Sequence, residues 1–214
     1  MTTLLLTAFE PFGGEDINPS WEIARTFDKQ WVGDTYVVSY CLPCIFGESL
    51  KALERAIIEV KPDIVISLGQ AGGRPDITPE RVAINFDDAR IADNAGNQPI
   101  DTPVDPGGAA AYFTTLPVKA IVQALHESGV PASVSYTAGT FVCNHVFYGL
   151  QQLAIRYGIK KSGFVHIPYL TQQATKYKGQ PSMNKQTLVD GLCTMIETVA
   201  STNKDVLMVG GETH

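Results

Sequence analysis

This chain of 214 residues lacks the features that would assign it to nucleic-acid binding. It has no run of lysine and arginine and no basic patch with interleaved aromatic residues. Its 16 Lys and Arg stand against 22 Asp and Glu, which gives a net charge of −6 at pH 7. Binding to a phosphate backbone requires clustered positive charge. We therefore expect no nucleic-acid partner.

The chain also lacks an uninterrupted hydrophobic run of the length that a membrane span needs. Residues 128–155 contain no Lys, Arg, Asp or Glu, but proline, glycine, asparagine, histidine and glutamine residues interrupt them. This pattern favours a buried strand and helix over a transmembrane segment. The N-terminus has neither a positively charged segment nor a small-residue cleavage site. We expect a cytoplasmic protein with no membrane partner.

Cysteine is scarce, with four residues: Cys41, Cys44, Cys143 and Cys193. In a reducing compartment we expect thiols rather than disulfides. Cys41 and Cys44 have the C-x-x-C spacing of redox motifs, but no second C-x-x-C is present to complete a zinc site. Redox chemistry stays open for this pair, and buried thiols beside a pocket are the favoured interpretation. Because the chain also lacks an EF-hand loop and an H-E-x-x-H motif, we expect no metal. No organic cofactor is expected either.

Strand-like and helix-like segments alternate along the chain. Short apolar runs at residues 4–9, 36–40, 64–68, 132–137 and 163–167 predict strands, and amphipathic patterns at 19–27, 49–60, 118–127, 144–157 and 185–200 predict helices. Asn18 and Pro19 are typical of an N-cap and a first helical residue. The alternation predicts an α/β fold, a three-layer α/β/α sandwich with a largely parallel central sheet.

One domain over residues 1–214 accommodates these elements, and we expect the tail from 201 to 214 to fray. Residues 81–86 alternate as a strand does. Residues 87–108 are rich in Asp, Asn, Pro and Gly, and a loop of that length inside a compact domain is usually functional or mobile.

Cys143 stands where an apolar strand gives way to a helical pattern. Ligands of open α/β sheets bind beyond the carboxyl ends of the strands. A helix N-terminus there offers free N–H groups and a positive dipole end, which would lower the pKa of the thiol and stabilise an oxyanion. On position alone, a nucleophile and a buried structural cysteine are equally acceptable interpretations.

A cysteine nucleophile requires a base within hydrogen-bonding reach. His126 on a helix face and His214 at the terminus are poor candidates. His145 is two residues from Cys143, a separation that turns helical side chains about 200° apart, so a structural role is expected for it. His166 lies near the end of the strand 163–167, where a neighbouring parallel strand could bring it to the same edge. For the acid that orients the base, Glu80 competes with Asp87 and Asp88.

Several motifs, in order along nearly the whole chain, resemble those of the pyroglutamyl peptidase I (pyrrolidone-carboxylate peptidase) family of cysteine peptidases. They are Phe-Glu-Pro-Phe-Gly at 9–13, Asn-Pro-Ser at 18–20, Leu-Gly-Gln-Ala-Gly-Gly-Arg at 68–74, Ile-Thr-Pro-Glu-Arg-Val-Ala-Ile-Asn at 77–85, Asp-Ala-Arg at 88–90, Gly-Asn-Gln-Pro-Ile-Asp at 96–101, Gly-Thr-Phe-Val-Cys-Asn-His at 139–145 and Phe-Val-His-Ile-Pro at 164–168. Ala8 is a departure, because glycine is expected there. The resemblance implies that Cys143 is the nucleophile, His166 the base and Glu80 the acid that orients it.

The resemblance further implies a substrate, a peptide whose N-terminal glutamate has cyclised to pyroglutamate. Its neutral lactam calls for an apolar pocket with a few hydrogen bonds. Phe9 and Phe12 are suited to sandwich the flat ring. The remaining candidates for substrate binding are Asn18, Gln70, Arg90, Ile91, Phe141 and Val142, with Arg90 beside the reacting carbonyl. The cysteine would form a thioester that water hydrolyses, and the resemblance implies a homo-oligomer, a tetramer or a dimer.

Two other classes of protein are compatible with parts of the sequence. A nucleoside phosphorylase-like enzyme could hold phosphate with the glycines of residues 69–73 or 107–108. Those loops lack the Lys-Ser/Thr of a P-loop, and phosphorolysis gives Cys143 no role. A non-catalytic binding module is the second alternative, which slow alkylation of Cys143 by iodoacetamide would support.

Overall fold

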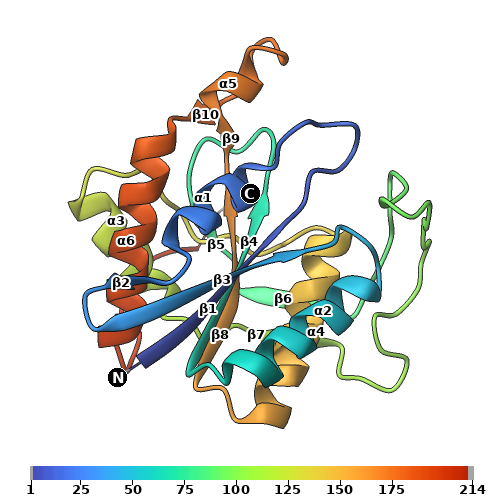
Figure 1. Cartoon of the computed structure of the whole chain (residues 1–214), viewed down its shortest axis with the longest axis horizontal. Helices are drawn as coiled ribbons and strands as arrows, with labels where there is room; N and C mark the ends of the chain where they lie inside the picture. Colours follow the sequence, from blue (N-terminus) through green and yellow to red (C-terminus); the bar gives the residue numbers. More distant parts are fainter. Residues whose placement is uncertain (1, 212–214) are drawn as a thin grey trace.

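A six-stranded sheet forms the centre of the protein in the computed structural model, which describes residues 2–211. Its strands follow the order β2-β3-β1-β4-β8-β5 (Figure 1). β3, β1, β4 and β8 are parallel to one another, whereas the edge strands β2 and β5 run antiparallel to their neighbours. The strands are β1 (Thr2–Phe9), β2 (Gln30–Val32), β3 (Thr35–Leu42), β4 (Ile64–Gln70), β5 (Thr78–Pro79) and β8 (Lys161–Ile167). The predicted, largely parallel sheet is confirmed.

Helices cover both faces of the sheet. α1 (Pro19–Ala24), α3 (Val118–Glu127) and α6 (Lys185–Ser201) lie on one face, and α2 (Glu48–Val60) and α4 (Val142–Tyr157) lie on the other (Figure 1). Smaller elements are the 3-10 turn Arg25–Phe27, the hairpin of β6 (Val82–Ile84) with β7 (Ala111–Phe113), and an excursion of β9 (Tyr169–Leu170), α5 (Thr171–Ala174) and β10 (Ser182–Met183). The three-layer sandwich is thereby confirmed.

Side-chain alternation along β1 explains why the sheet needs both helical layers. Leu4, Leu6 and Ala8 belong to the apolar cluster under α1, α3 and α6, while Leu5 and Phe9 belong to the cluster under α2 and α4. Successive side chains of a strand point to opposite faces, so an uninterrupted apolar strand is stable only between two covered faces. Ala8, the departure from the expected glycine, is fully buried and pairs with Cys41 in an undistorted stretch of β1.

The prediction of a strand over 132–137 is wrong. These residues make only isolated parallel bridges, Ala132 with Ile77 and Ser135 with Glu80. Pro79 interrupts the ladder because it has no N–H to donate, and β5 beside it is two residues long. Two predicted boundaries also shift: the strand predicted over 81–86 is limited to β6, and the helix predicted from 144 begins at Val142.

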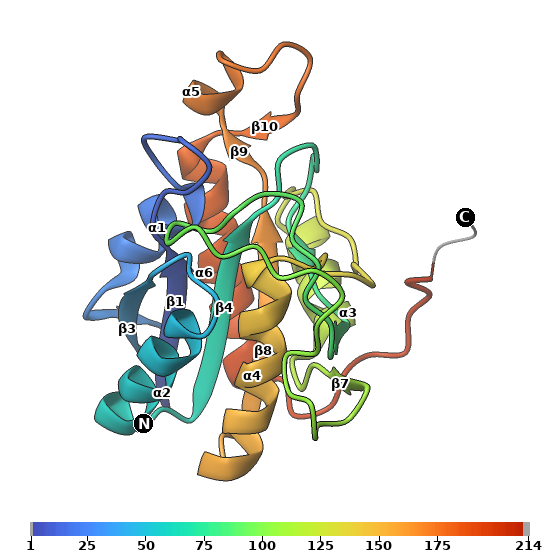
Figure 2. The ribbon, with the colours of Figure 1, turned by 90° about the vertical axis from the view of Figure 1, so that its right-hand side faces the viewer.

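Residues 85–110 form the long connection between β6 and β7, and buried side chains fix it in place. Asp93 accepts hydrogen bonds from the N–H groups of Phe46, Ala95 and Asn97. Figure 2 shows this loop passing across the N-terminal end of α4, where the N–H of Asp88 donates to the carbonyl of Thr140 over 3.0 Å.

The C-terminal tail, which we expected to fray, is described as far as residue 211. Residues 202–211 form no helix or strand, yet Asp205 accepts from the N–H groups of Lys119 and Ala120 at the start of α3. The expectation for residues 212–214 falls outside the described residues. No helix within 2–211 is both long and apolar enough to cross a membrane.

The close packing of α2 on α4 depends on Gly149, and this generates the first prediction. A Cβ at this position would overlap the side chain of Leu50. We expect Gly149→Ala to destabilise the fold by about 1–3 kcal/mol through overpacking and to lower Tm by roughly 2–10 °C. Differential scanning calorimetry measures the effect. Ile155→Ala on the exposed face of the same helix is the control, since Ile155 is 73% exposed, and an equal loss in both variants would contradict the prediction.

Candidate active site

The pairing of β4 with β8 determines which residues share the face beneath α4. Gly69 lies directly opposite His166, and Ser67 lies opposite Phe164. Residues opposite each other in a parallel pair direct their side chains to the same face, on strands about 4.8 Å apart. His166 therefore projects toward α4 beside a position that carries no side chain.

Cys143 occupies the space that Gly69 leaves. A Cβ on Gly69 would lie 3.0 Å from the Cys143 Sγ and 2.7 Å from the ring of Phe164. The sulfur therefore comes within contact distance of the backbone of β4, next to the strand position from which His166 projects. The structure brings the predicted nucleophile and base to one edge of the sheet, from α4 and β8.

The first turn of α4 provides hydrogen-bond donors beside the sulfur. Cys143 is the second residue of this helix, and the N-cap residue Phe141 makes no side-chain capping bond. The first N–H groups of a helix have no acceptor within it. The backbone N–H groups of Val142, Cys143 and Asn144 are therefore available to a negatively charged oxygen near Sγ.

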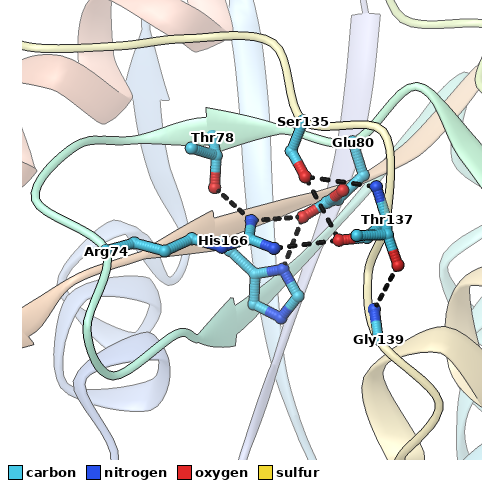
Figure 3. A network of polar contacts seen from close by, with 7 residues as sticks. All are labelled: Arg74, Thr78, Glu80, Ser135, Thr137, Gly139 and His166. Atoms are coloured by element: carbon cyan, nitrogen blue, oxygen red, sulfur yellow. Dashed lines mark hydrogen bonds and ion pairs between the residues drawn. The ribbon is translucent and has the colours of Figure 1, made fainter. Parts of the chain in front are cut away.

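A buried carboxylate orients His166. Glu80 follows β5, is fully buried, and accepts a hydrogen bond of 2.7 Å from Nδ1 of His166 through its Oε1. A neutral imidazole that donates from Nδ1 keeps Nε2 as a proton acceptor. Figure 3 shows this second ring nitrogen pointing away from Glu80.

Arg74 is a site residue that the sequence reasoning missed. Its Nη1 donates to the same Oε1 of Glu80 over 2.7 Å and to Oγ1 of Thr78 over 2.8 Å, and its Nη2 donates to the carbonyl of Thr137 over 2.9 Å (Figure 3). The sequence contains a signal for Arg74, because this residue ends the motif at residues 68–74. In that loop, however, the sequence predicts roles only for the glycines and for Gln70.

The pKa of the Cys143 thiol differs from the expectation. Burial, followed by the charge of Glu80, raises this pKa to about 12, and Arg74 acts in the opposite direction. The expectation that the helix N-terminus lowers the pKa of this thiol is wrong for the resting site, because desolvation of the thiolate outweighs the favourable charges. A nucleophilic role for this thiol therefore requires a base beside it.

Asp87, Asp88 and His145 make contacts other than those of the Glu80–His166 pair. Nδ1 of His145 pairs with Oδ2 of the buried Asp87 at 2.7 Å, and its Nε2 accepts the N–H of Gly47 over 3.0 Å. With both ring nitrogens engaged, His145 joins the loop after β6 to the start of α2, and its predicted structural role is confirmed. Asp88 contributes its backbone to the contact with Thr140.

Three phenylalanine rings lie beside the N-terminus of α4. Phe12 lies 6.0 Å from Phe141 between ring centroids, and Phe46 meets Phe141 edge-on at 5.4 Å. We call these residues, Phe12, Phe46 and Phe141, the aromatic cluster. Phe46 was not among the predicted residues. The cluster gives the surroundings of Cys143 an apolar character suited to a flat, neutral ring.

The other predicted substrate residues divide into buried and exposed groups. Phe9 is 2% exposed and stacks at a tilt on Phe164, 6.2 Å away, and Val142 is fully buried in the same apolar cluster. Arg90 is exposed, and Ile91 is 39% exposed and lies over Gly13 of the first loop.

The two predicted polar residues have protein partners. Asn18 caps α1, with Oδ1 accepting from the backbone N–H of Ser20 over 3.0 Å, and its Nδ2 donates to the carbonyl of Glu10. It therefore fixes the first loop. Gln70, at the end of β4, accepts from Nε2 of Gln173 through its side-chain oxygen over 3.1 Å, which places it between the sheet and the α5 excursion.

The four cysteines are free thiols. Burial raises the pKa of Cys41 to about 11 and also raises that of Cys44, which is the behaviour of packed thiols rather than of a reactive redox pair. Within residues 2–211, His, Cys, Asp and Glu side chains form no group of three or more that could hold a metal ion.

Comparisons with known proteins agree with this geometry. The family model for pyroglutamyl peptidase matches residues 2–202. The pyrrolidone-carboxylate peptidases of Bacillus cereus strain G9842 and Escherichia fergusonii are 55% and 56% identical to this chain, over 100% of both sequences in each case. The crystal structure of pyroglutamyl peptidase I from Bacillus amyloliquefaciens, 46% identical, superposes with a TM-score of 0.95 over 97% of this chain and 99% of that one. The chain belongs to the pyroglutamyl peptidase family.

Proposed function

We propose that Cys143, His166 and Glu80 are the catalytic residues with which this cysteine-type omega-peptidase removes an N-terminal pyroglutamyl residue from a peptide. The observation that carries the proposal is the position of the Cys143 sulfur at the side-chain-free Gly69, directly opposite His166. A thiol whose pKa is raised to about 12 requires such a base.

In the proposed reaction, Nε2 of His166 accepts the thiol proton as the Cys143 sulfur attacks the carbonyl that links pyroglutamate to the next residue. Glu80 holds the ring through Nδ1 and stabilises the imidazolium that forms. The N–H groups of the first turn of α4 hold the oxyanion, with Arg90 assigned beside it by the resemblance. His166 then protonates the leaving amine, and water hydrolyses the thioester.

Recognition of the lactam is assigned to the aromatic cluster together with Phe9, Ile91 and Val142. Pyroglutamate has no α-amine, so the site needs no carboxylate or metal to anchor one. Asn18 contributes by holding the first loop in place, and Gln70 lies at the end of β4, where a lactam N–H or carbonyl could find a partner.

The remaining parts of the proposal concern the whole molecule. We infer a single domain over residues 1–214, because one sheet supplies Gly69, His166 and the segment that carries Glu80. Four free thiols support a cytoplasmic location. A homo-oligomer, a tetramer or a dimer, follows from the resemblance, and analytical ultracentrifugation tests it.

The second prediction concerns the catalytic residues. We expect Cys143→Ser and His166→Ala each to abolish release of a chromophore from a pyroglutamyl amide, because a serine hydroxyl is a much weaker nucleophile than a thiol and alanine leaves no base. Glu80→Gln is expected to be milder, with a loss of roughly 10²–10⁴-fold in kcat. The matched control is His145→Ala, which removes another buried histidine paired with a carboxylate. It should lower Tm while keeping most of kcat, and a near-normal rate in His166→Ala would refute the assignment.

The third prediction concerns the aromatic cluster. We expect Phe12→Ala to raise KM for a pyroglutamyl amide by roughly 10–100-fold, since about 1.5–3 kcal/mol of apolar contact with the ring is lost. The effect on kcat should be smaller. Phe113→Ala is the control, because Phe113 is 71% exposed on β7. Steady-state kinetics of both variants decide the matter, and an unchanged KM in Phe12→Ala would remove Phe12 from the substrate site.

A further inference from the structure

We propose, on the basis of the proposed function, that Arg74 is a positioning residue of this peptidase: its guanidinium holds the Glu80 carboxylate in place for His166 and connects it to the turn that leads to Cys143. Arg74 contacts neither the sulfur nor the imidazole through a hydrogen bond in the described structure. Its effect on catalysis is therefore indirect, through Glu80 and through the backbone at Thr137.

The guanidinium joins two residues close to it in the sequence, Thr78 and Glu80, to a distant one, Thr137. Nη1 is shared between the Thr78 hydroxyl and Oε1 of Glu80, and Nη2 reaches the Thr137 carbonyl (Figure 3). The planar fork of arginine has donors fixed in direction, so three acceptors at once determine where its plane lies. The carboxylate that accepts from it is fixed in the same way.

Because Glu80 is buried, its negative charge requires a positively charged partner, which Arg74 provides. Its side chain is 0% exposed, whereas that of Arg74 is 28% exposed. A carboxylate without a charged or hydrogen-bonded partner is costly inside a protein. Oε1 accepts from both Arg74 and His166, while Oε2 is buried without a partner among the described residues. The position of Oε1, on which the orientation of His166 depends, is thus determined jointly by the two donors.

The contact with Thr137 extends this arrangement to the nucleophile. Residues 137–141 form the turn between the edge of the sheet and α4. Oγ1 of Thr137 accepts the N–H of Gly139 over 3.1 Å, and Gly139 has a φ of +78°, which favours glycine. Arg74 therefore links two groups. One is the carboxylate of Glu80, which orients His166, and the other is the start of the turn that leads to Cys143.

The charges of Arg74 and Glu80 act on the thiol in opposite directions. Arg74 lowers the pKa of Cys143, and Glu80 raises it. Below the pKa, the rate of alkylation follows the fraction of thiolate. Loss of Arg74 should raise this pKa and slow alkylation at a fixed pH, whereas loss of the Glu80 charge should lower it and speed alkylation. If Arg74 merely supported the fold, the two substitutions would not change the alkylation rate in opposite directions.

A double-mutant cycle is the main test and constitutes the fourth prediction. We expect Arg74→Gln to lower kcat for a pyroglutamyl amide by roughly 10–100-fold with KM nearly unchanged. In a Glu80→Gln background the same substitution should lower kcat by a clearly smaller factor, because the part of its effect that passes through Glu80 is already lost and only the contact with Thr137 and the charge near the thiol remain. Multiplicative losses in the double variant, or an unchanged kcat in Arg74→Gln, would overturn the proposal.

Arg156→Gln is the matched control for the cycle. Arg156 also pairs with a glutamate, Glu54, at 2.9 Å, but its side chain is 65% exposed and lies at the far end of α4. Arg156→Gln should leave kcat and KM unchanged.

Iodoacetamide alkylation of Cys143 at pH 8, followed by intact mass spectrometry, provides the second readout. It should be slower than wild type in Arg74→Gln and faster in Glu80→Gln, and a shift in the same direction in both would count against the proposal.

Thr78→Val keeps the test decisive if Arg74→Gln does not fold. This variant removes only the hydroxyl that accepts from Nη1 of Arg74, and it should lower kcat in the same direction by a smaller factor, with Tm measured in parallel. An unchanged kcat in a folded Thr78→Val protein would contradict the proposal. Activity in Cys143→Ser or His166→Ala would instead overturn the proposed function itself, so the two failures are distinguishable.

Discussion

The in-register pairing of β4 with β8 is the constraint on which the site depends. It places Gly69 opposite His166 and Ser67 opposite Phe164. A slip of one residue would turn His166 to the opposite face of the sheet, under α1 and α6, since side chains alternate with a period of two. The apolar residues that flank His166 oppose such a slip, because Val165 and Ile167 pack in the cluster on that opposite face. The hydrophobic pattern that stabilises the sheet thus also directs His166, the proposed base, toward α4.

The two buried carboxylate–histidine pairs show how similar contacts serve different purposes. Each has a separation of 2.7 Å through Nδ1. In the Asp87–His145 pair, Nε2 accepts the N–H of Gly47, so both ring nitrogens are engaged and the imidazole acts as a bridge between segments. In the Glu80–His166 pair, the second nitrogen points away from the polar network (Figure 3). The carboxylate of this second pair also has the arginine partner. The two histidines thus differ in the occupancy of the other ring nitrogen, and the proposed role of His166 as a base depends on this difference.

The layers of the fold could be predicted from the sequence because their signals are local. Continuous apolar strands such as 64–68 and amphipathic helices such as 49–60 require only periodicity. The segment 132–137 alternates between apolar and polar residues as a strand does, but Pro79 of a distant strand limits its pairing to isolated bridges, which no local pattern reveals. Cys143, His166 and Glu80 could be named through the motifs around them. The partners of Arg74 could not be predicted from its glycine-rich loop, because they lie 4, 6 and 63 positions away in the sequence.

The raised pKa of Cys143 agrees with the neutral ligand of the proposed function. A neutral lactam favours apolar surroundings, and the aromatic cluster at the N-terminus of α4 supplies them. The same apolar surroundings disfavour a thiolate, so burial raises the pKa of the thiol although a helix N-terminus lies beside it. If the site lowered the pKa of Cys143 by admitting water, its apolar contact with the pyroglutamyl ring would be weaker. In the proposed reaction, recognition and nucleophilicity are therefore in conflict at this position, and the proposed base, oriented by Glu80, resolves the conflict by removing the proton only as the sulfur reacts. This proposal accounts for the burial of the charged Glu80 beside His166. It also accounts for the partner of Glu80, the guanidinium of Arg74, which three hydrogen bonds hold in place.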